Sequence, residues 1–417
     1  MKQISIIAAT FSGNRGAEAM LCSTIARLRD RFPDSIFNVY SYYPNDDRLI
    51  IRDSKINIYN AAPMVLVFKI FFLSIPVWFC RLLKLNILTK YFPRSLRSLS
   101  SSDVLIDLAG VSFIDGREKF IPYNILSILP AVIMGIPVVK FSQAMGPFKS
   151  KINRISANYL LKKCDAVFAR GEITEEYLQS LNLKSSICHS AADVAFLHES
   201  KDGLTHENEK YVSSIVSKLK KLKKKDRMII GLCPSSLIAQ KSRKSGWDYI
   251  GFLQDTVKLL NEKGYSVIMF PNATRDYDMA HLRNNDLPVI LSVMKNISGS
   301  ENIYVDRNIN SVSIKSLISM CDVTVVSRFH AMVGSLSLKI PVMVLGWSHK
   351  YLEVMGQFGQ EKYVFDYKKT DRDYLWLKMF DLIDKRKKES LKIGNRLNTV
   401  KKSSYSQIDY VIRLLNK

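Results

Sequence analysis

The sequence predicts an α/β fold made of two halves that face each other across a cleft. Its 417 residues exceed the usual size of a single core, and a hydrophobic content of 47% is ample for two packed cores. Strand-like and helix-like stretches alternate along the chain, which is typical of mainly parallel sheets covered by helices on both faces. The alternation restarts after a lysine-rich helical stretch at 210–225, so a domain boundary is expected there.

That boundary predicts four segments. They are an N-terminal domain at 1–209, a basic helical linker at 210–226, a C-terminal domain at 227–373 and basic C-terminal helices at 374–417. Apolar, β-branched runs bounded by turn residues predict the strands. These runs are 4–9, 36–42, 55–61, 104–109, 137–142, 166–169, 186–188, 228–232, 266–270, 303–305, 323–326 and 341–345.

A glycine-bearing turn at 10–16 follows the first strand and precedes a helical stretch at 17–28. A glycine turn between a strand and a helix can cradle a phosphate, because the backbone can come close and the helix start favours negative charge. The turn matches neither GxGxxG nor the P-loop pattern. A turn that only connects a strand to a helix explains it equally well.

The stretch 322–347 carries the side chains best placed for chemistry. Ser327, Arg328 and His330 stand where a predicted strand passes into a predicted helix, at the sheet edge where ligands bind. A guanidinium can hold a carboxylate or phosphate, and a histidine can give or take a proton near neutral pH. A structural ion pair and a helix-capping histidine would account for the same two residues without any ligand.

Small and polar residues follow other predicted strands. The loop after 266–270 contains Asn272 and Arg275, and Arg170 would add another cation if the two halves face each other. Strand ends at 110–113 and 143–147 also suit a cleft. Asp276 and Asp278 share the loop of Asn272, where an Asx-rich turn is the simpler interpretation.

The net charge of +23 suits an anionic partner. The excess lies at 216–227 and near the C-terminus without interleaved aromatics, which favours a solvated basic surface over nucleic-acid binding. Six scattered cysteines without a CxxC pair, and histidines without metal-ligand spacing, predict reduced thiols and no metal site. Because the first strand begins at once, no signal peptide is expected, and we predict a cytoplasmic protein.

The most hydrophobic stretch is 63–88. Lys69, Arg81 and Lys84 interrupt it and Pro76 would kink a helix, so a core-packed or amphipathic helical pair is predicted rather than a membrane span. Basic residues beside bulky apolar ones also suit a helix on a membrane face. Peripheral contact with the inner face of the cell membrane is the alternative prediction.

Five short motifs occur in a fixed order along the chain. They are SGNRGAEAML at 12–21, QAMGPF at 143–148, ARGEITEEYL at 169–178, ADVAF at 192–196, and SRFHAMVGSL at 327–336 followed by IPVMVLGW. Together they resemble the polysaccharide pyruvyltransferase family over roughly residues 4 to 360. This resemblance implies two Rossmann-like domains similar to those of GT-B glycosyltransferases.

The resemblance also implies an activity, namely transfer of pyruvate from phosphoenolpyruvate to a sugar, forming a ketal. The acceptor would be a surface polysaccharide, an oligosaccharide or a lipid-linked precursor, with no cofactor besides the donor substrate. His330 would be the catalytic acid. The predicted substrate-binding residues are Arg328, Arg170, Ser327, Asn14, Gly16, Asn272 and Arg275.

The chain departs from the family pattern at two places. Ala17 stands where many relatives have aspartate, and Ala109-Gly110 stands where they have a glycine pair, so the role of the N-terminal turn is open. The acceptor's general base is unassigned, with Glu18, Asp115 and Asp276 as candidates. A GT-B glycosyltransferase using a nucleotide sugar and a non-catalytic scaffold of polysaccharide assembly at the membrane are the rival interpretations.

Overall fold

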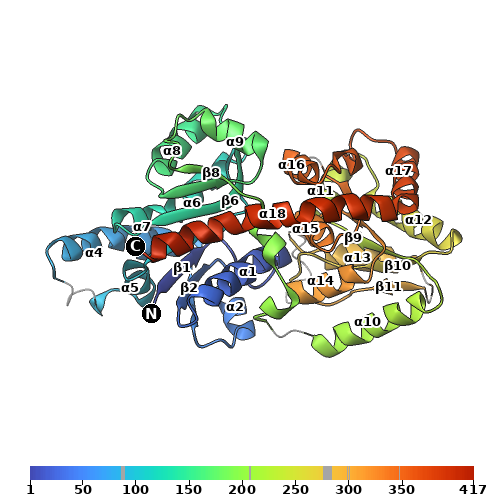
Figure 1. Cartoon of the computed structure of the whole chain (residues 1–417), viewed down its shortest axis with the longest axis horizontal. Coiled ribbons are helices and arrows are strands. Elements are labelled where there is room, and N and C mark those ends of the chain that lie inside the picture. Colours follow the sequence, from blue (N-terminus) through green and yellow to red (C-terminus); the bar gives the residue numbers. More distant parts are fainter. Residues whose placement is uncertain (86–89, 206–207, 276–283, 298, 300, 347) are drawn as a thin grey trace. The chain divides into compact units, whose positions relative to one another are not determined.

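The computed structural model describes residues 1–85, 90–205, 208–275, 284–297, 299, 301–346 and 348–417. The chain divides into two compact units, each with a parallel sheet flanked by helices (Figure 1). The predicted α/β class with two halves is therefore confirmed. Asp276 and Asp278 lie outside the described residues.

The first unit contains an eight-stranded sheet in the order β3-β2-β1-β4-β6-β7-β8, with β5 paired to β6. Every strand pair is parallel. The strands are β1 (Gln3–Ile7), β2 (Ile36–Ser41), β3 (Ile56–Asn60), β4 (Val104–Asp107), β5 (Val111–Ile114), β6 (Val138–Gly146), β7 (Ala166–Ala169) and β8 (Cys188–Ser190). The main helices are α1 (Arg15–Arg31), α2 (Pro44–Ile50), α3 (Pro63–Val65), the π-helix η1 (Leu66–Phe71), α4 (Phe72–Leu82), α5 (Arg94–Ser100), α6 (Ile121–Leu126), α7 (Leu129–Ile133), α8 (Lys151–Leu161) and α9 (Glu172–Gln179).

The second unit contains a six-stranded parallel sheet in the order β11-β10-β9-β12-β13-β14, the Rossmann strand order. The strands are β9 (Ile229–Cys233), β10 (Ser266–Met269), β11 (Asn302–Tyr304), β12 (Val323–Val326), β13 (Val342–Leu345) and β14 (Val364–Phe365). Their central residues are apolar and buried, as expected for a sheet covered on both faces. The main helices are α10 (Glu209–Lys223), α11 (Ser236–Lys244), α12 (Tyr249–Glu262), α13 (Leu287–Met294), α14 (Ser311–Ser319), α15 (Phe329–Ser337), α16 (His349–Gln357), α17 (Arg372–Asp384) and α18 (Arg386–Leu415).

The boundaries between the units differ from the predicted ones. The first unit comprises 1–12, 20–198 and 401–417, and the second comprises 13–19 and 199–400. The predicted linker at 210–226 is largely α10, which packs against α14 in the second unit. The end of α18 joins the first unit, where the Gln407 side-chain amide donates to the carbonyl of Ala192 at 2.9 Å. Neither packing contact is visible in local sequence patterns.

Two predicted strand ends are strands instead. Residues 143–146, expected to line a cleft, continue β6 and are buried, and 111–114 form β5. The two segments pair with each other as parallel strands, with Val111 opposite Ala144 and Ile114 opposite Gly146. These residues therefore belong to the sheet of the first unit.

Candidate functional site

The strand order of the second unit reverses between β9 and β12. In open parallel sheets, ligands bind beyond the carboxyl ends of the strands at such a reversal. Here those ends lead into Ser235 and Ser236 after β9 and into Ser327 and Arg328 after β12, and the Ser327 amide donates to the carbonyl of Cys233 at 2.8 Å. The topology thus places the turn at 327–330 where a binding site is expected.

Ser327 is buried and joins the two strand ends. Its hydroxyl accepts a hydrogen bond from the hydroxyl of Tyr249 at 2.8 Å. The Tyr249 hydroxyl in turn accepts a hydrogen bond from the backbone amide of Ser235 at 3.2 Å. The hydroxyl of Tyr351 donates to the Ser327 carbonyl at 3.3 Å. Burial, more than any other factor, raises the pKa of Tyr249 well above its ordinary value, so its phenol stays protonated. Ser327 therefore positions the turn.

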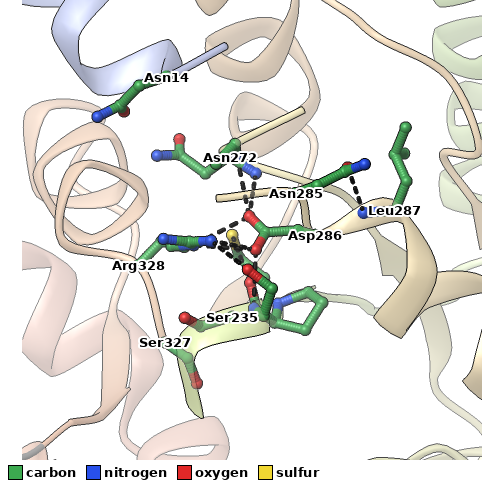
Figure 2. A network of polar contacts seen from close by, with 12 residues as sticks. Asn14, Ser235, Asn272, Asn285, Asp286, Leu287, Ser327 and Arg328 are labelled. Atoms are coloured by element: carbon green, nitrogen blue, oxygen red, sulfur yellow. Dashed lines mark hydrogen bonds and ion pairs between the residues drawn. The ribbon is translucent and has the colours of Figure 1, made fainter. Parts of the chain in front are cut away.

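Arg328, the N-cap residue of α15, forms an ion pair with Asp286. Its Nε lies 3.0 Å from both carboxylate oxygens, and its Nη2 donates to Asp286 Oδ1 and, at 3.0 Å, to the hydroxyl of Ser236 (Figure 2). Burial would lower the pKa of Arg328, but the Asp286 charge and its hydrogen bonds raise it above the ordinary value. The structural ion pair, one of the two sequence interpretations, is thus present.

Asp286 is a buried centre of this network that sequence reasoning missed. Its carboxylate also accepts backbone N–H bonds from Ser236 at 2.9 Å, Asn272 at 3.2 Å and Ala273 at 2.9 Å. Ser236 begins α11 and Asp286 itself precedes α13, so two positive helix starts lie beside the carboxylate. An aspartate just before Leu-Pro at a helix start was the available signal. The chain's own carboxylate therefore occupies the place expected for an anion.

The glycine turn near the N-terminus belongs to this site. The amide of Arg15 donates to the carbonyl of Asn272 at 3.1 Å, and the amide of Thr274 donates to the carbonyl of Gly13 at 2.9 Å. Between these bonds, Asn14 and Ala273 form an antiparallel bridge. In Figure 2, the side-chain amides of Asn14 and Asn272 and the guanidinium of Arg328 lie on the same side of Asp286. The turn is thus fixed to the loop that follows β10.

The glycines of this turn allow two close approaches. A β-carbon built on Gly16 would lie 2.0 Å from Nδ1 of His330, so only glycine fits beside that imidazole. Gly13 has φ +76°, and a β-carbon there would lie 3.0 Å from Nη2 of Arg275. Gly16 lies in the first turn of α1 and His330 in the first turn of α15, so two helix starts meet at the histidine. This corner therefore combines a histidine, two arginines and positive helix ends.

Seven of the eight predicted site residues thus come together within the second unit. They are Asn14, Gly16, Asn272, Arg275, Ser327, Arg328 and His330. Arg170 lies in the first unit instead, directly after β7, where its Nη1 donates to Oδ2 of Asp193 at 3.2 Å. Its side chain is 1% exposed, so the guanidinium is buried.

Two candidates for the acceptor's general base have structural partners. Glu18 is buried and binds the guanidinium of Arg15 at 2.8 Å, the hydroxyl of Thr205 at 2.7 Å and the amide of Ser311 at 3.0 Å. Asp115, in the first unit, accepts a bond from the side-chain amide of Asn153 at 2.7 Å and bonds from two backbone amides. The third candidate, Asp276, lies outside the described residues. The base therefore stays unassigned.

The described side chains do not indicate a metal site or a reactive thiol. Among the residues that the structure describes, no group of three or more His, Cys, Asp and Glu side chains could hold a metal ion. All six cysteines are free thiols. Burial raises the pKa of Cys233, which lies at the end of β9, well above its ordinary value, so that thiol is a poor nucleophile.

Comparison with known proteins identifies the family. The family model described as Polysaccharide pyruvyl transferase matches residues 14–349, which include Asn14 and Gly16 of the glycine turn and the turn at 327–330. The chain belongs to the polysaccharide pyruvyl transferase family. Within the curated proteins, it is 21% identical over 371 residues to the amylovoran biosynthesis protein AmsJ of Erwinia amylovora, covering 83% of this chain and 84% of that protein.

Solved structures show which fold this member of the polysaccharide pyruvyl transferase family has. The S. aureus MnaA–UDP structure is 13% identical with a TM-score of 0.60, covering 100% of this chain and 98% of that chain. The Anabaena HepE structure in complex with UDP is 12% identical with a TM-score of 0.54 and full coverage of both chains. The UDP-GlcNAc 2-epimerase of Neisseria meningitidis is 13% identical with a TM-score of 0.56, covering 99% and 100%. The predicted GT-B-like fold of two Rossmann-like domains is confirmed.

Proposed function

We propose that this protein transfers pyruvate from phosphoenolpyruvate to a sugar of a surface polysaccharide or of its lipid-linked precursor, forming a cyclic ketal. Family membership supports a transferase acting on polysaccharide. The relative AmsJ is a protein of amylovoran biosynthesis, which agrees with a polysaccharide acceptor. We expect the reaction to take place in the cytoplasm, without a cofactor.

The observation that carries this proposal is the contact between Gly16 and His330 at two helix starts. The contact holds the imidazole in one place, beside backbone N–H groups that favour an anion. Phosphoenolpyruvate has a phosphate and a carboxylate, and it therefore needs several donors close together. Arg275, the side-chain amides of Asn14 and Asn272, and the outer edge of Arg328 supply them.

The ion pair with Asp286 changes the role proposed for Arg328. Its Nε and Nη2 are used by Asp286 and Ser236, whereas Nη1 has no hydrogen-bond acceptor within the part of the chain that the structure describes. The 15% exposure of the side chain leaves this edge accessible. Arg328 then contributes a single fixed N–H edge to the donor, while Asp286 sets its orientation. The burial of Arg170 and its ion pair with Asp193 favour a structural role for this arginine over donor binding.

The proposed reaction begins with proton transfer from protonated His330 to the methylene carbon of phosphoenolpyruvate. The neighbouring carbon then becomes cation-like and is attacked by a sugar hydroxyl, which loses its proton. Phosphate leaves, and a second hydroxyl closes the ketal with loss of another proton. The net products are the pyruvylated sugar and inorganic phosphate, and no oxidant or reductant is needed.

The test replaces the proton donor. His330→Ala should lower acceptor-dependent phosphate release from phosphoenolpyruvate by about 10²–10⁴-fold, the usual contribution of general acid catalysis. The melting temperature should change little, because the imidazole is only partly buried. His189→Ala, on β8 of the first unit, is the matched control and should keep wild-type turnover. Near-normal turnover of His330→Ala would refute the assignment of the acid.

Transfer from a nucleotide sugar is the second candidate function. The MnaA and HepE structures with a similar fold were determined with UDP, and such an enzyme would also need an anion-binding corner. The two functions differ in donor. Phosphate release from phosphoenolpyruvate supports the first, and acceptor-dependent release of a nucleoside diphosphate from a sugar nucleotide would support the second.

A further inference from the structure

A helical run on the first unit exposes an apolar face that no described part of that unit covers. The run Pro63–Leu82 comprises α3, η1 and α4, and it is the one described helix long and apolar enough to span a membrane. Only 22% of its most apolar stretch is buried. The predicted pair of helices kinked at Pro76 is therefore one continuous helical run that includes that proline.

One face of this run is part of the core. Leu66, Ile70 and Val77 are almost fully buried in the same apolar cluster as Leu96 of α5 and Ala131 of α7. Figure 1 shows α4 beside these two helices, and α4 packs against both. A helix anchored along its length in a soluble core cannot at the same time cross a bilayer surrounded by lipid. The run therefore lies along the surface of the unit.

The opposite face is exposed and apolar. Its large side chains recur at intervals of three or four residues, the spacing of one helix face. They are Met64, Phe68, Phe72, Ile75, Phe79 and Leu82. Phe68, Phe72 and Phe79 are 57, 52 and 51% exposed, and Trp78 beside them is 39% exposed. A contiguous row of exposed aromatic side chains is unusual on a soluble surface and indicates an interaction site.

The charges in this part of the sequence indicate what covers the face. Residues 63–100 contain six cations and no aspartate or glutamate, within a chain of net charge +23. The cations are Lys69, Arg81, Lys84, Lys90, Arg94 and Arg97. Two copies of such a face would bring like charges together, which disfavours self-association. Anionic lipid headgroups above an acyl layer provide both the negative charge and the apolar phase.

We propose that the face formed by Met64, Phe68, Phe72, Ile75, Phe79 and Leu82 docks the protein on the surface of an anionic lipid bilayer. The aromatic side chains enter the boundary between headgroups and acyl chains, while the exposed Lys69 and Lys84 contact the headgroups. The core-packed face keeps the helix parallel to the membrane plane. This docking is independent of the proposed reaction, because it involves only the first unit and none of the site residues.

Vesicle sedimentation with the full chain tests the apolar part. Wild-type protein should bind vesicles made of phosphatidylglycerol and phosphatidylcholine in equal parts. In the variant Phe68→Ser/Phe72→Ser/Phe79→Ser, the partition coefficient onto these vesicles should fall about tenfold or more for each side chain replaced. Folding should be preserved, since all three side chains are exposed. The matched control, Leu49→Ser/Leu377→Ser/Leu391→Ser, removes three other exposed apolar side chains and should bind like wild type. Equal losses in both triple variants would refute the proposal.

Charge reversal tests the electrostatic part. Lys69→Glu/Lys84→Glu should weaken binding to the anionic vesicles several-fold for each cation, and added salt should weaken wild-type binding. Lys221→Glu/Lys224→Glu, at the end of α10 and its C-cap in the second unit, makes the same change in net charge and should bind more tightly than Lys69→Glu/Lys84→Glu. Equal weakening by both pairs would mean that net charge alone drives adsorption.

Trp78 reports the location of the contact. Its fluorescence should shift to shorter wavelength on binding to anionic vesicles, and Trp78→Phe should abolish that shift while leaving sedimentation intact. An unchanged shift in Trp78→Phe would place the contact elsewhere. A dimer in analytical ultracentrifugation that the triple serine variant abolishes, with no vesicle binding by wild type, would make this face a self-association surface and refute the proposal.

Discussion

Each unit has an arginine at the end of a parallel strand, and the surroundings of these two arginines differ. Arg170 comes directly after β7 and Arg328 shortly after β12, and each is paired with a buried aspartate. Arg170 is 1% exposed, whereas Arg328 is 15% exposed and lies beside the glycine turn. The same kind of local signal, an arginine at a strand end, is thus part of a buried ion pair in one unit and of an accessible corner in the other. An arginine at a strand end indicates a ligand site only where part of the guanidinium stays accessible.

The largest expected effect comes from Asp286→Ala. It leaves Arg328 without its counter-charge and three backbone N–H groups without an acceptor, and we expect a loss of about 5 kcal/mol in stability. Hydrogen exchange measured by mass spectrometry should locate the loss of protection in 229–275. Protection lost equally in the first unit would show that Asp286 is not a local centre of the second.

Asp193→Ala makes the corresponding change in the first unit. The buried Arg170 charge loses this partner, and the amide of Ala195 loses an acceptor at 2.9 Å, so we expect a loss of about 3 kcal/mol, smaller than for Asp286→Ala. Backbone hydrogen exchange should become faster in residues 166–197, whereas residues 229–275 should stay protected. A larger loss than for Asp286→Ala would reverse the ranking of the two networks.

Gly16→Ala and Gly110→Ala compare the packing beside His330 in the second unit with the packing beside Arg170 in the first unit. The new methyl group at 16 would lie 2.0 Å from His330, whereas at 110 the nearest atom is Nη1 of Arg170 at 3.8 Å, an ordinary contact. We expect Gly16→Ala to cost about 1–3 kcal/mol through overpacking and to abolish most activity, and Gly110→Ala to stay within about 0.5 kcal/mol of wild type.

A double variant separates the two effects of Gly16→Ala. Removing the imidazole in Gly16→Ala/His330→Ala should restore the melting temperature of the His330→Ala protein, since the clash is gone. Activity should stay low. Failure to restore stability would mean that alanine at 16 disturbs the start of α1 itself rather than the position of His330.

Much of this architecture could be predicted from the sequence, because hydrophobic periodicity is local. The stretch 322–347 was predicted as strand, turn, helix and strand, and it forms β12, α15 and β13 with Ser327 and Arg328 in the turn. Asp286 could not be assigned as the partner of Arg328, because the pairing depends on where α13 begins in space. The glycine at position 16, within the first helical turn, was the sequence signal that another group approaches the backbone closely there. It did not identify His330 as that group.

The assignment of residues 13–16 of the glycine turn to the second unit was also beyond local patterns. The turn at 10–16 follows a strand of the first unit, and its pairing with Ala273 joins residues more than half the chain apart. Helix α1 is continuous across this division, so no break in periodicity marks it. Long-range backbone pairing of this kind requires the structure.

Donor-dependent thermal stabilisation tests the central claim most directly. Phosphoenolpyruvate at about 100 times its dissociation constant should stabilise the wild-type protein by about 2.7 kcal/mol, because only the folded protein binds it. Arg328→Lys should lose most of this ligand-induced increase, because lysine lacks the planar, fixed guanidinium, and Arg170→Lys should keep it. Stabilisation by UDP-glucose with none by phosphoenolpyruvate, or an equal loss in both lysine variants, would contradict a pyruvyl donor site at Arg328 and His330.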